Sequence, residues 1–235
     1  MKKIRLIFTI LLLLAFVPCT KGQEMQQVTV EDHNGNILYS TNLTSSDTIT
    51  FSKFSVPHGS SGVLINGVLW ATCNVDAPGT FATSPSASGM FYQFNRRMGW
   101  SSTDPMINHE GGTTWDSSLS EGGNWETAKN PCPTGWRVPT LAEQQSLLNY
   151  SSFWGELNGV SGRFFGNGDQ RVFFPAAGYR SNSEGTLYGV GDEGYYWSAT
   201  SYSNCAHYME FFNGYAGIYY YFYRSYGLSV RCVSE

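Results

Sequence analysis

Residues 195–233 read YYWSATSYSNCAHYMEFFNGYAGIYYYFYRSYGLSVRCV. The stretch contains four segments rich in aromatic and β-branched side chains, at 195–198, 206–212, 218–223 and 228–233. Such side chains favour strands, and the Gly-, Asn- and Ser-rich breaks between the segments are typical of turns. We therefore predict that this part of the chain forms short antiparallel strands.

The same stretch is dense in tyrosine. Ten of the fifteen tyrosines lie between residues 195 and 226, and the only full charges there are Glu210 and Arg224. A strand over residues 218–223 would carry aromatic side chains on both faces, so one face must meet a neighbouring element or point outward. The rings are either ordinary sheet residues with solvated hydroxyl groups, or a recognition surface with the Tyr, Ser, Gly and Asn composition of antibody-type binding sites.

Upstream, two local signals predict further elements. Thr140 and Glu143 form a capping box, which predicts a helix from Pro139 to about residue 149. Asn66-Gly67 separates two apolar triplets and predicts a hairpin.

Residues 76–130 lack hydrophobic periodicity and are rich in Gly, Ser, Thr and Asn. A long stretch of this kind is held in place by large buried side chains or serves a function. We expect Trp100, Trp115 and Trp125 to anchor it, because each indole ring can bury a large area under irregular backbone.

The N-terminus has the pattern of a secretory signal. Residues 2–5 supply positive charge, residues 6–17 form an apolar run too short to span a bilayer as a helix, and small residues precede Gln23. We predict cleavage before Gln23 and a secreted or cell-surface location. The alternative is a lipoprotein signal with Cys19 as the lipidated residue, and only then do we expect membrane attachment.

The predicted domain organisation has three parts: a signal peptide at 1–22, a β-hairpin segment at 23–62 and a main domain at 63–235. Within the second part, apolar residues alternate with polar ones on both sides of Asn34-Gly35, which is typical of a hairpin. A further short strand is expected over Thr48–Phe51. This segment is too small to form its own core, so it must dock on another surface.

Charge and motifs exclude several classes of protein. Loss of residues 1–22 leaves 10 basic and 18 acidic residues, a net charge of −8, which argues against a nucleic-acid partner. No H-E-x-x-H, G-x-S-x-G or Gly-rich phosphate loop occurs, and the four histidines are scattered. We therefore expect no catalytic residues, no metal site and no cofactor.

Four cysteines follow the predicted signal: Cys73, Cys132, Cys205 and Cys232. Export permits disulfides, and four cysteines allow three full pairings. No two of them have C-x-x-C spacing, so the pairing stays open at this point.

Five motifs occur in order along the chain: WATCNV at 70–75, NPCPTGWRVPT at 130–140, FPAAGYR at 174–180, GYYWS at 194–198 and GLSVRCV at 227–233. Over roughly residues 63–235 the chain resembles the Fibrobacter succinogenes major paralogous domain, a family of secreted proteins in Bacteroidetes-like bacteria. The resemblance implies an α+β, C-type-lectin-like fold, related to the formylglycine-generating-enzyme fold. This fold has mostly short antiparallel strands and one or two helices, here preceded by the small β-hairpin segment.

The resemblance also implies a disulfide between Cys132 and Cys232, with Cys205 left as a product of sequence diversification. A Cys73–Cys205 bond is compatible with it. The third arrangement joins Cys73 to Cys132 and Cys205 to Cys232.

The C-terminal segment is similar to the variable region of proteins diversified by retroelements, which carry Tyr, Ser, Asn, Gly and Phe at scattered positions of a fixed framework. This resemblance implies a ligand-binding surface formed by Asn204, His207, Tyr208, Phe212, Tyr215, Tyr219, Tyr220, Tyr221, Phe222, Tyr223, Ser225 and Tyr226.

We therefore predict a secreted or surface-displayed, non-enzymatic protein that binds a protein or glycan on another cell or surface. One alternative is a structural or adhesive envelope or pilus-tip subunit, in which the aromatic side chains are buried by assembly. A more remote alternative is an enzyme of the formylglycine-generating class. The oligomeric state is left open.

Overall fold

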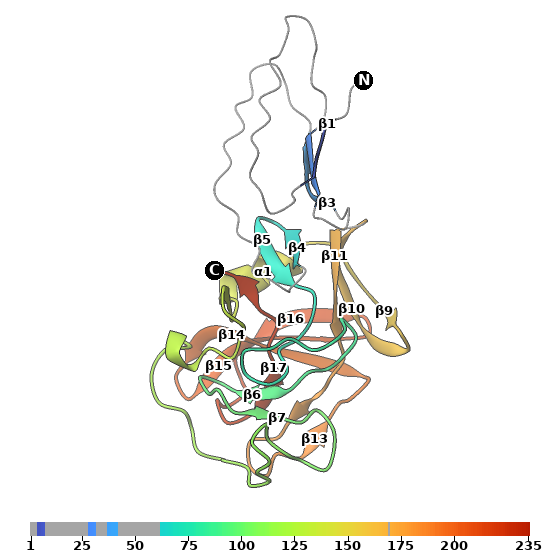
Figure 1. Cartoon of the computed structure of the whole chain (residues 1–235). Helices are drawn as coiled ribbons and strands as arrows, with labels where there is room; N and C mark the ends of the chain where they lie inside the picture. The colour runs from blue at the N-terminus through green and yellow to red at the C-terminus, as the bar shows by residue number, and fades with distance from the viewer. Residues whose placement is uncertain (1–3, 8–27, 32–36, 42–61, 169) are drawn as a thin grey trace, which may run out of the picture. The chain divides into compact units, whose positions relative to one another are not determined.

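The computed structural model describes residues 4–7, 28–31, 37–41, 62–168 and 170–235 (Figure 1). The chain divides into two compact units, Met1–Ser55 and Val56–Glu235.

In the first unit, strand β2 (Val28–Glu31) pairs in parallel with β1 (Ile4–Ile7) and antiparallel with β3 (Ile37–Thr41). Strands β2 and β3 lie in the segment for which the sequence predicts a hairpin. The Asn34-Gly35 turn, the Thr48–Phe51 strand, Cys19 and the expected cleavage site lie outside the described residues.

The second unit is built around an eight-stranded sheet in the order β13-β12-β17-β14-β15-β16, in which β6 also pairs with β17 and with β7. Its strands are β6 (Phe91–Gln93), β7 (Gly99–Trp100), β12 (Tyr179–Arg180), β13 (Leu187–Tyr188), β14 (Glu193–Tyr202), β15 (Cys205–Phe212), β16 (Tyr215–Tyr219) and β17 (Gly227–Ser229). Strands β14, β15 and β16 form an antiparallel meander. Ser203 and Gly214, in its two turns, have positive φ angles of 53° and 91°, a conformation typical of tight hairpins.

Two smaller sheets complete this unit. One contains β4 (Gly62–Ile65), β5 (Val68–Ala71), β18 (Val233–Ser234) and β8 (Trp136–Arg137), in that order. The other is a second antiparallel meander of β9 (Ser152–Leu157), β10 (Val160–Asn167) and β11 (Gln170–Pro175). The predicted Asn66-Gly67 hairpin is confirmed as the β4–β5 pair.

The predicted helix is confirmed as α1 (Leu141–Leu148). The Thr140 hydroxyl accepts a hydrogen bond from the Glu143 amide, and the Glu143 carboxylate accepts one from the Thr140 amide at 2.7 Å. A short 3₁₀ turn, η1, covers Thr127–Lys129.

The predicted fold class is wrong. The structure is mostly β, with 42% strand and 6% helix, and its several sheets are accompanied by one α-helix in the described part of the chain. This composition is not clearly α+β, and the arrangement of sheets does not confirm the C-type-lectin-like fold. The physical reason is that nearly all apolar segments of the second unit, which are rich in aromatic side chains and interrupted by glycine, pair as strands.

The central sheet has a hydrophobic core on each face. Successive residues of a strand point to opposite faces. Tyr195 and Trp197 therefore enter one core, which the irregular segment 75–138 helps to form, and Tyr196 enters the other, to which α1 and the β9–β11 meander contribute. Strand β14 is thus buried on both sides.

Covalent and aromatic anchors fix the irregular segment. The predicted Cys132–Cys232 disulfide is confirmed, and Cys73 and Cys205 are free. Trp100 is buried and packs on the half-buried Trp115, with 4.9 Å between ring centres. Among the described residues, no helix is long and apolar enough to cross a membrane.

A candidate ligand-binding surface of aromatic side chains

Most of the predicted binding residues lie around the β14–β15–β16 meander and the loop that follows it. Six of them are exposed: Asn204, Phe212, Tyr215, Tyr220, Tyr221 and Tyr223. Four are half-buried: His207, Tyr219, Phe222 and Tyr226. Tyr208 and Ser225 are buried, each with 2% of its surface exposed, so these two do not reach the surface. Tyr208 is buried because Phe222 packs on its ring and Trp197 and Tyr219 flank it on the neighbouring strands.

The loop after β16 folds back over the sheet. Strand β16 ends at Tyr219, four residues before the end predicted from the sequence. In the loop, the Phe222 ring stacks on Tyr195 and Tyr208, with 5.4 and 4.7 Å between ring centres, and on Tyr226 at 4.2 Å. Phe222 therefore fixes the loop against the sheet, and the neighbouring tyrosines are held in place with it.

Six aromatic side chains form a continuous row of ring contacts, which we call the aromatic row: Tyr202, Tyr220, Tyr221, Tyr219, Tyr215 and Phe212. The successive distances between ring centres are 4.5, 4.8, 6.0, 6.2 and 5.3 Å. Tyr202 is absent from the residues predicted from the sequence, although it lies at the start of the tyrosine-rich stretch. Five members are exposed, and Tyr221 is the most exposed at 65%.

Within the row, Tyr215 and Tyr219 are linked through their hydroxyl groups. The Tyr219 hydroxyl donates to the Tyr215 hydroxyl at 2.9 Å, and this bond raises the pKa of Tyr219 to about 12. The pair spans Gly217, because a Cβ atom placed there would lie 2.0 Å from the Tyr215 hydroxyl oxygen. The Tyr215 ring can lie here only because glycine has no side chain.

Two carboxylates lie on the same sheet face as Tyr215 and Tyr219. The Tyr195 hydroxyl donates to Glu193 Oε2 at 2.9 Å, and Glu210 is the cross-strand neighbour of Tyr195. Burial, with a smaller contribution from the nearby Glu193, raises the pKa of Glu210 above its usual value. Neither carboxylate was singled out from the sequence as a binding residue.

Two side chains of β15, His207 and Cys205, have pKa values shifted so that their neutral forms are favoured. Burial lowers the pKa of His207, whose ring lies 5.7 Å from Tyr202 and 5.6 Å from Tyr220. Burial also raises the pKa of the Cys205 thiol, which donates a weak hydrogen bond to the Tyr221 carbonyl at 3.6 Å. His207 thus packs on the aromatic row through its ring, and Cys205 is hydrogen-bonded to the backbone of the row.

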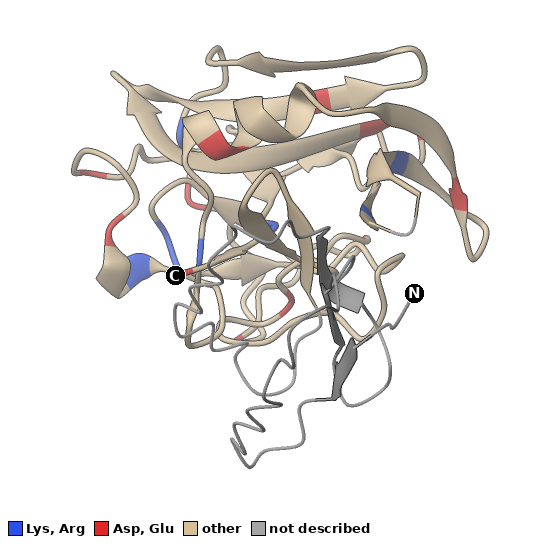
Figure 2. Cartoon of the chain, turned by 90° about the horizontal axis from the view of Figure 1, so that it is seen from above, with Lys and Arg blue, Asp and Glu red and all other residues tan. Residues whose placement is uncertain are grey.

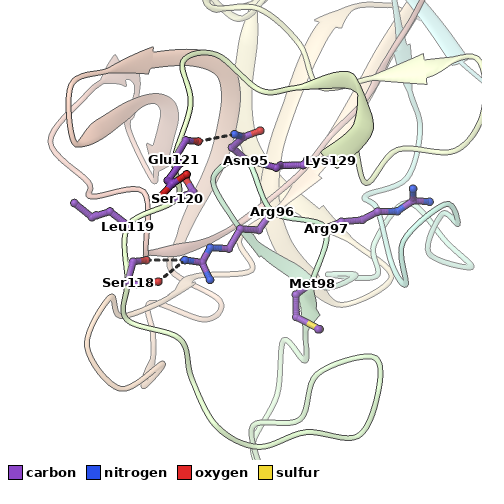
Figure 3. Close-up of a pocket in the computed structure, with 9 residues that line it drawn as sticks. All are labelled: Asn95, Arg96, Arg97, Met98, Ser118, Leu119, Ser120, Glu121 and Lys129. Carbon is purple, nitrogen blue, oxygen red and sulfur yellow. Dashed lines mark hydrogen bonds between the residues drawn. The ribbon is translucent and has the colours of Figure 1, made fainter.

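A separate cavity of about 550 Å³ has none of the predicted binding residues in its lining (Figure 3). It lies between residues 95–98 and 118–121. Arg96 donates hydrogen bonds to the carbonyl and hydroxyl oxygens of Ser118, at 2.9 and 2.8 Å, and pairs with Asp116. None of the residues that line it is aromatic, so the cavity lacks the stacking surfaces that make the aromatic row the stronger candidate.

Comparison with known proteins gives one match. A family model described as "Domain of unknown function (DUF8237)" matches residues 153–233. The matched region contains most of both meanders, the disulfide cysteine Cys232 and all of the aromatic row. No curated protein and no solved structure matches the chain.

Proposed function

We propose that the chain is an exported, non-enzymatic binding protein that holds a protein or glycan ligand on the aromatic row. The observation that carries this proposal is the continuous contact of six rings along the β14–β16 meander, five of them exposed. Contiguous exposed apolar patches of soluble proteins commonly mark interaction sites.

The support of the row suits recognition. Its rings lie on and beside a meander in which β14 is buried on both faces, and Phe222 fixes the following loop. Side chains that are ordered before binding lose little conformational entropy when the ligand arrives. Tyrosine adds a large apolar area and a hydroxyl group at the cost of two torsion angles.

Two parts of the proposal, export and diversification, rest on the sequence alone. The first comes from the signal-like pattern of residues 1–22, and the second from the resemblance of residues 204–226 to variable regions. A near-identical template repeat that differs at adenines, beside a reverse transcriptase gene, would support diversification. A gene neighbourhood with neither would remove diversification and leave the binding proposal in place.

The direct test is a screen of the labelled protein on glycan and cell-surface protein arrays. We expect a ligand that the Tyr215→Ala/Tyr221→Ala variant loses, because both rings are exposed members of the row. The control is Phe153→Ala, which removes a ring that is 44% exposed on β9. Equal binding by the double variant and the parent protein would contradict the proposal.

A finer variant moves a ring without deleting it. Gly217→Ala places a methyl group where the Tyr215 hydroxyl lies, and the backbone at Gly217 is not in a left-handed conformation. We expect the ring to swing away, the array ligand to bind at least about tenfold more weakly, and the melting temperature to change by less than about 3 °C. Unchanged affinity would show that the position of the Tyr215 ring does not matter.

A further inference from the structure

The surroundings of Glu210 are unusual for a carboxylate whose hydrogen-bonding partner is a tyrosine, Tyr195, rather than a base. On its own strand, Tyr208 and Phe212 lie two residues away on the same face. Across the sheet it faces Tyr195 on β14 and Gly217 on β16. Because the Tyr215 ring lies over Gly217, Glu210 has an aromatic ring on each of its four sides.

Glu193 belongs to the same arrangement. It lies two residues before Tyr195 on β14 and therefore on the same face, diagonal to Glu210. Its carboxylate is held by the Tyr195 hydroxyl. The Tyr179 ring packs on Tyr195 at 4.9 Å and on Tyr188 at 5.6 Å, which extends the aromatic surroundings on this side.

The surface has two acidic groups that no described base neutralises. Arg163 on β10 donates hydrogen bonds to the carbonyl groups of Phe212 and Tyr215, at 3.3 Å each, and pairs with neither carboxylate. Neither Glu193 nor Glu210 forms an ion pair with any residue that the structure describes. No lysine or arginine occurs in the sequence between Arg180 and Arg224. Those two arginines are buried and donate hydrogen bonds elsewhere, Arg180 to Gly185 and Arg224 to Gly122. Few positions of the described ribbon are coloured as acidic or basic residues (Figure 2).

We infer that Glu193, Glu210 and the surrounding rings bind an arginine side chain of a protein partner. A guanidinium group is planar, stacks on aromatic faces and donates paired hydrogen bonds to carboxylates. The exposed rings of Phe212 and Tyr215 supply the stacking faces, since Phe222 covers Tyr195 and Tyr208. The two carboxylates supply charge complementarity and acceptors. This inference rests on the proposed binding function and assigns the ligand of that surface as a protein with an exposed arginine.

The test uses a peptide of alternating arginine and glycine, with lysine and citrulline versions as comparison, and measures Kd by titration calorimetry. We expect Glu193→Gln/Glu210→Gln to raise the Kd of the arginine peptide at least about tenfold, because the partner loses its counter-charges. The matched control, Glu156→Gln/Glu184→Gln, removes the same charge at two exposed positions and should change Kd by less than about twofold. Glutamine keeps the shape and the acceptor oxygen, so folding is retained.

Three results would overturn the inference. They are equal weakening by the two double variants, binding of the citrulline peptide as tight as that of the arginine peptide, and a lysine peptide that binds as tightly as arginine.

The failures of the two proposals can be told apart. An array ligand lost by Tyr215→Ala/Tyr221→Ala but kept by Glu193→Gln/Glu210→Gln, such as a glycan, would overturn the arginine assignment and leave the binding function intact. Conversely, carboxylate-dependent binding of the arginine peptide, together with an array ligand that is insensitive to the tyrosine variant, would retain the arginine site and remove the role of the aromatic row.

Discussion

Two meanders of the molecule, β9–β10–β11 and β14–β15–β16, have the same architecture. They differ in the charged groups beside their aromatic rings, which are basic in the first and acidic in the second. Each is antiparallel, and each places rings in a shared core on one face. On its other face, the first carries Phe153, Phe164 and Phe173, with successive ring centres 4.9 and 4.8 Å apart, and the Arg171 guanidinium lies 5.8 Å from Phe153. The corresponding face of the second carries Glu193 and Glu210 instead.

The difference concerns the electrostatics of aromatic surfaces. The face of an aromatic ring carries negative partial charge and attracts cations. In the first meander, the protein supplies this cation itself. In the second, carboxylates add to the negative field, and neither of them forms an ion pair with a described residue. The proposed partner would supply the cation.

The largest expected effect comes from opening the loop that contains both meanders. The Cys132–Cys232 disulfide joins residues separated by 100 positions. Cys132→Ala/Cys232→Ala should lower the free energy of unfolding by about 3–5 kcal/mol, because the unfolded chain regains the entropy of an open loop. Urea unfolding followed by tryptophan fluorescence measures it. The free cysteines provide the control, since Cys73→Ala/Cys205→Ala should cost less than about 1 kcal/mol.

The next prediction compares a buried and an exposed side chain on the two faces of β15. Phe211 is fully buried, and its ring packs on Trp154 and Phe165 of the first meander and on Tyr196. Phe211→Ala should lower the free energy of unfolding by about 3–5 kcal/mol through the cavity it leaves. The adjacent Phe212 is 39% exposed, and Phe212→Ala should cost less than about 1 kcal/mol. Similar losses would mean that Phe212 also supports the fold.

A smaller effect tests the internal cation of the first meander. Arg171→Gln removes the contact with Phe153 and should lower the free energy of unfolding by about 0.5–1 kcal/mol. Arg97→Gln removes an equal charge from an exposed position with no such ring contact, and serves as the control in the same urea titration. An equal loss of stability in both variants would show that the effect comes from net charge and not from the ring contact.

The smallest effect should have the opposite sign. The pKa of Glu210 is raised in the folded state, so its charged form destabilises the fold above that pKa, and the penalty disappears as the pH falls below the usual value of 4.5. Glu210→Gln should raise the melting temperature at pH 7 by about 1–2 °C, a small gain because water screens a half-buried group. The gain should vanish near pH 4. An unchanged difference across this range would contradict the assignment.

Local signals predicted the elements that depend on few residues. The capping box of α1 and the Asn66-Gly67 turn are contained within four residues each, and both are confirmed. The Asn158-Gly159 turn between β9 and β10 has the same signature, with φ angles of 53° and 77°. It could have revealed a meander that the sequence prediction overlooked.

The end of β16 could not be predicted in this way. Residues 218–223 are aromatic at nearly every position, so their pattern contains no boundary. The boundary is set by partners distant in sequence. Strand β15 pairs with β16 as far as Tyr219, Phe222 then packs on Tyr195, and pairing resumes only as an isolated bridge between Cys205 and Tyr223. The same dependence on register buries Tyr208 and places Glu193 and Glu210, separate acids in the sequence, on one face.

The hydrogen bonds between β14, β15 and β16 join main-chain atoms, so the frame of the second meander does not depend on which side chains its outer positions carry. Exposed positions such as 212, 215 and 221 should therefore tolerate broad randomisation. We expect a combinatorial library at these sites to yield mostly folded members. The same meander could then be engineered as an affinity reagent for targets of chosen charge.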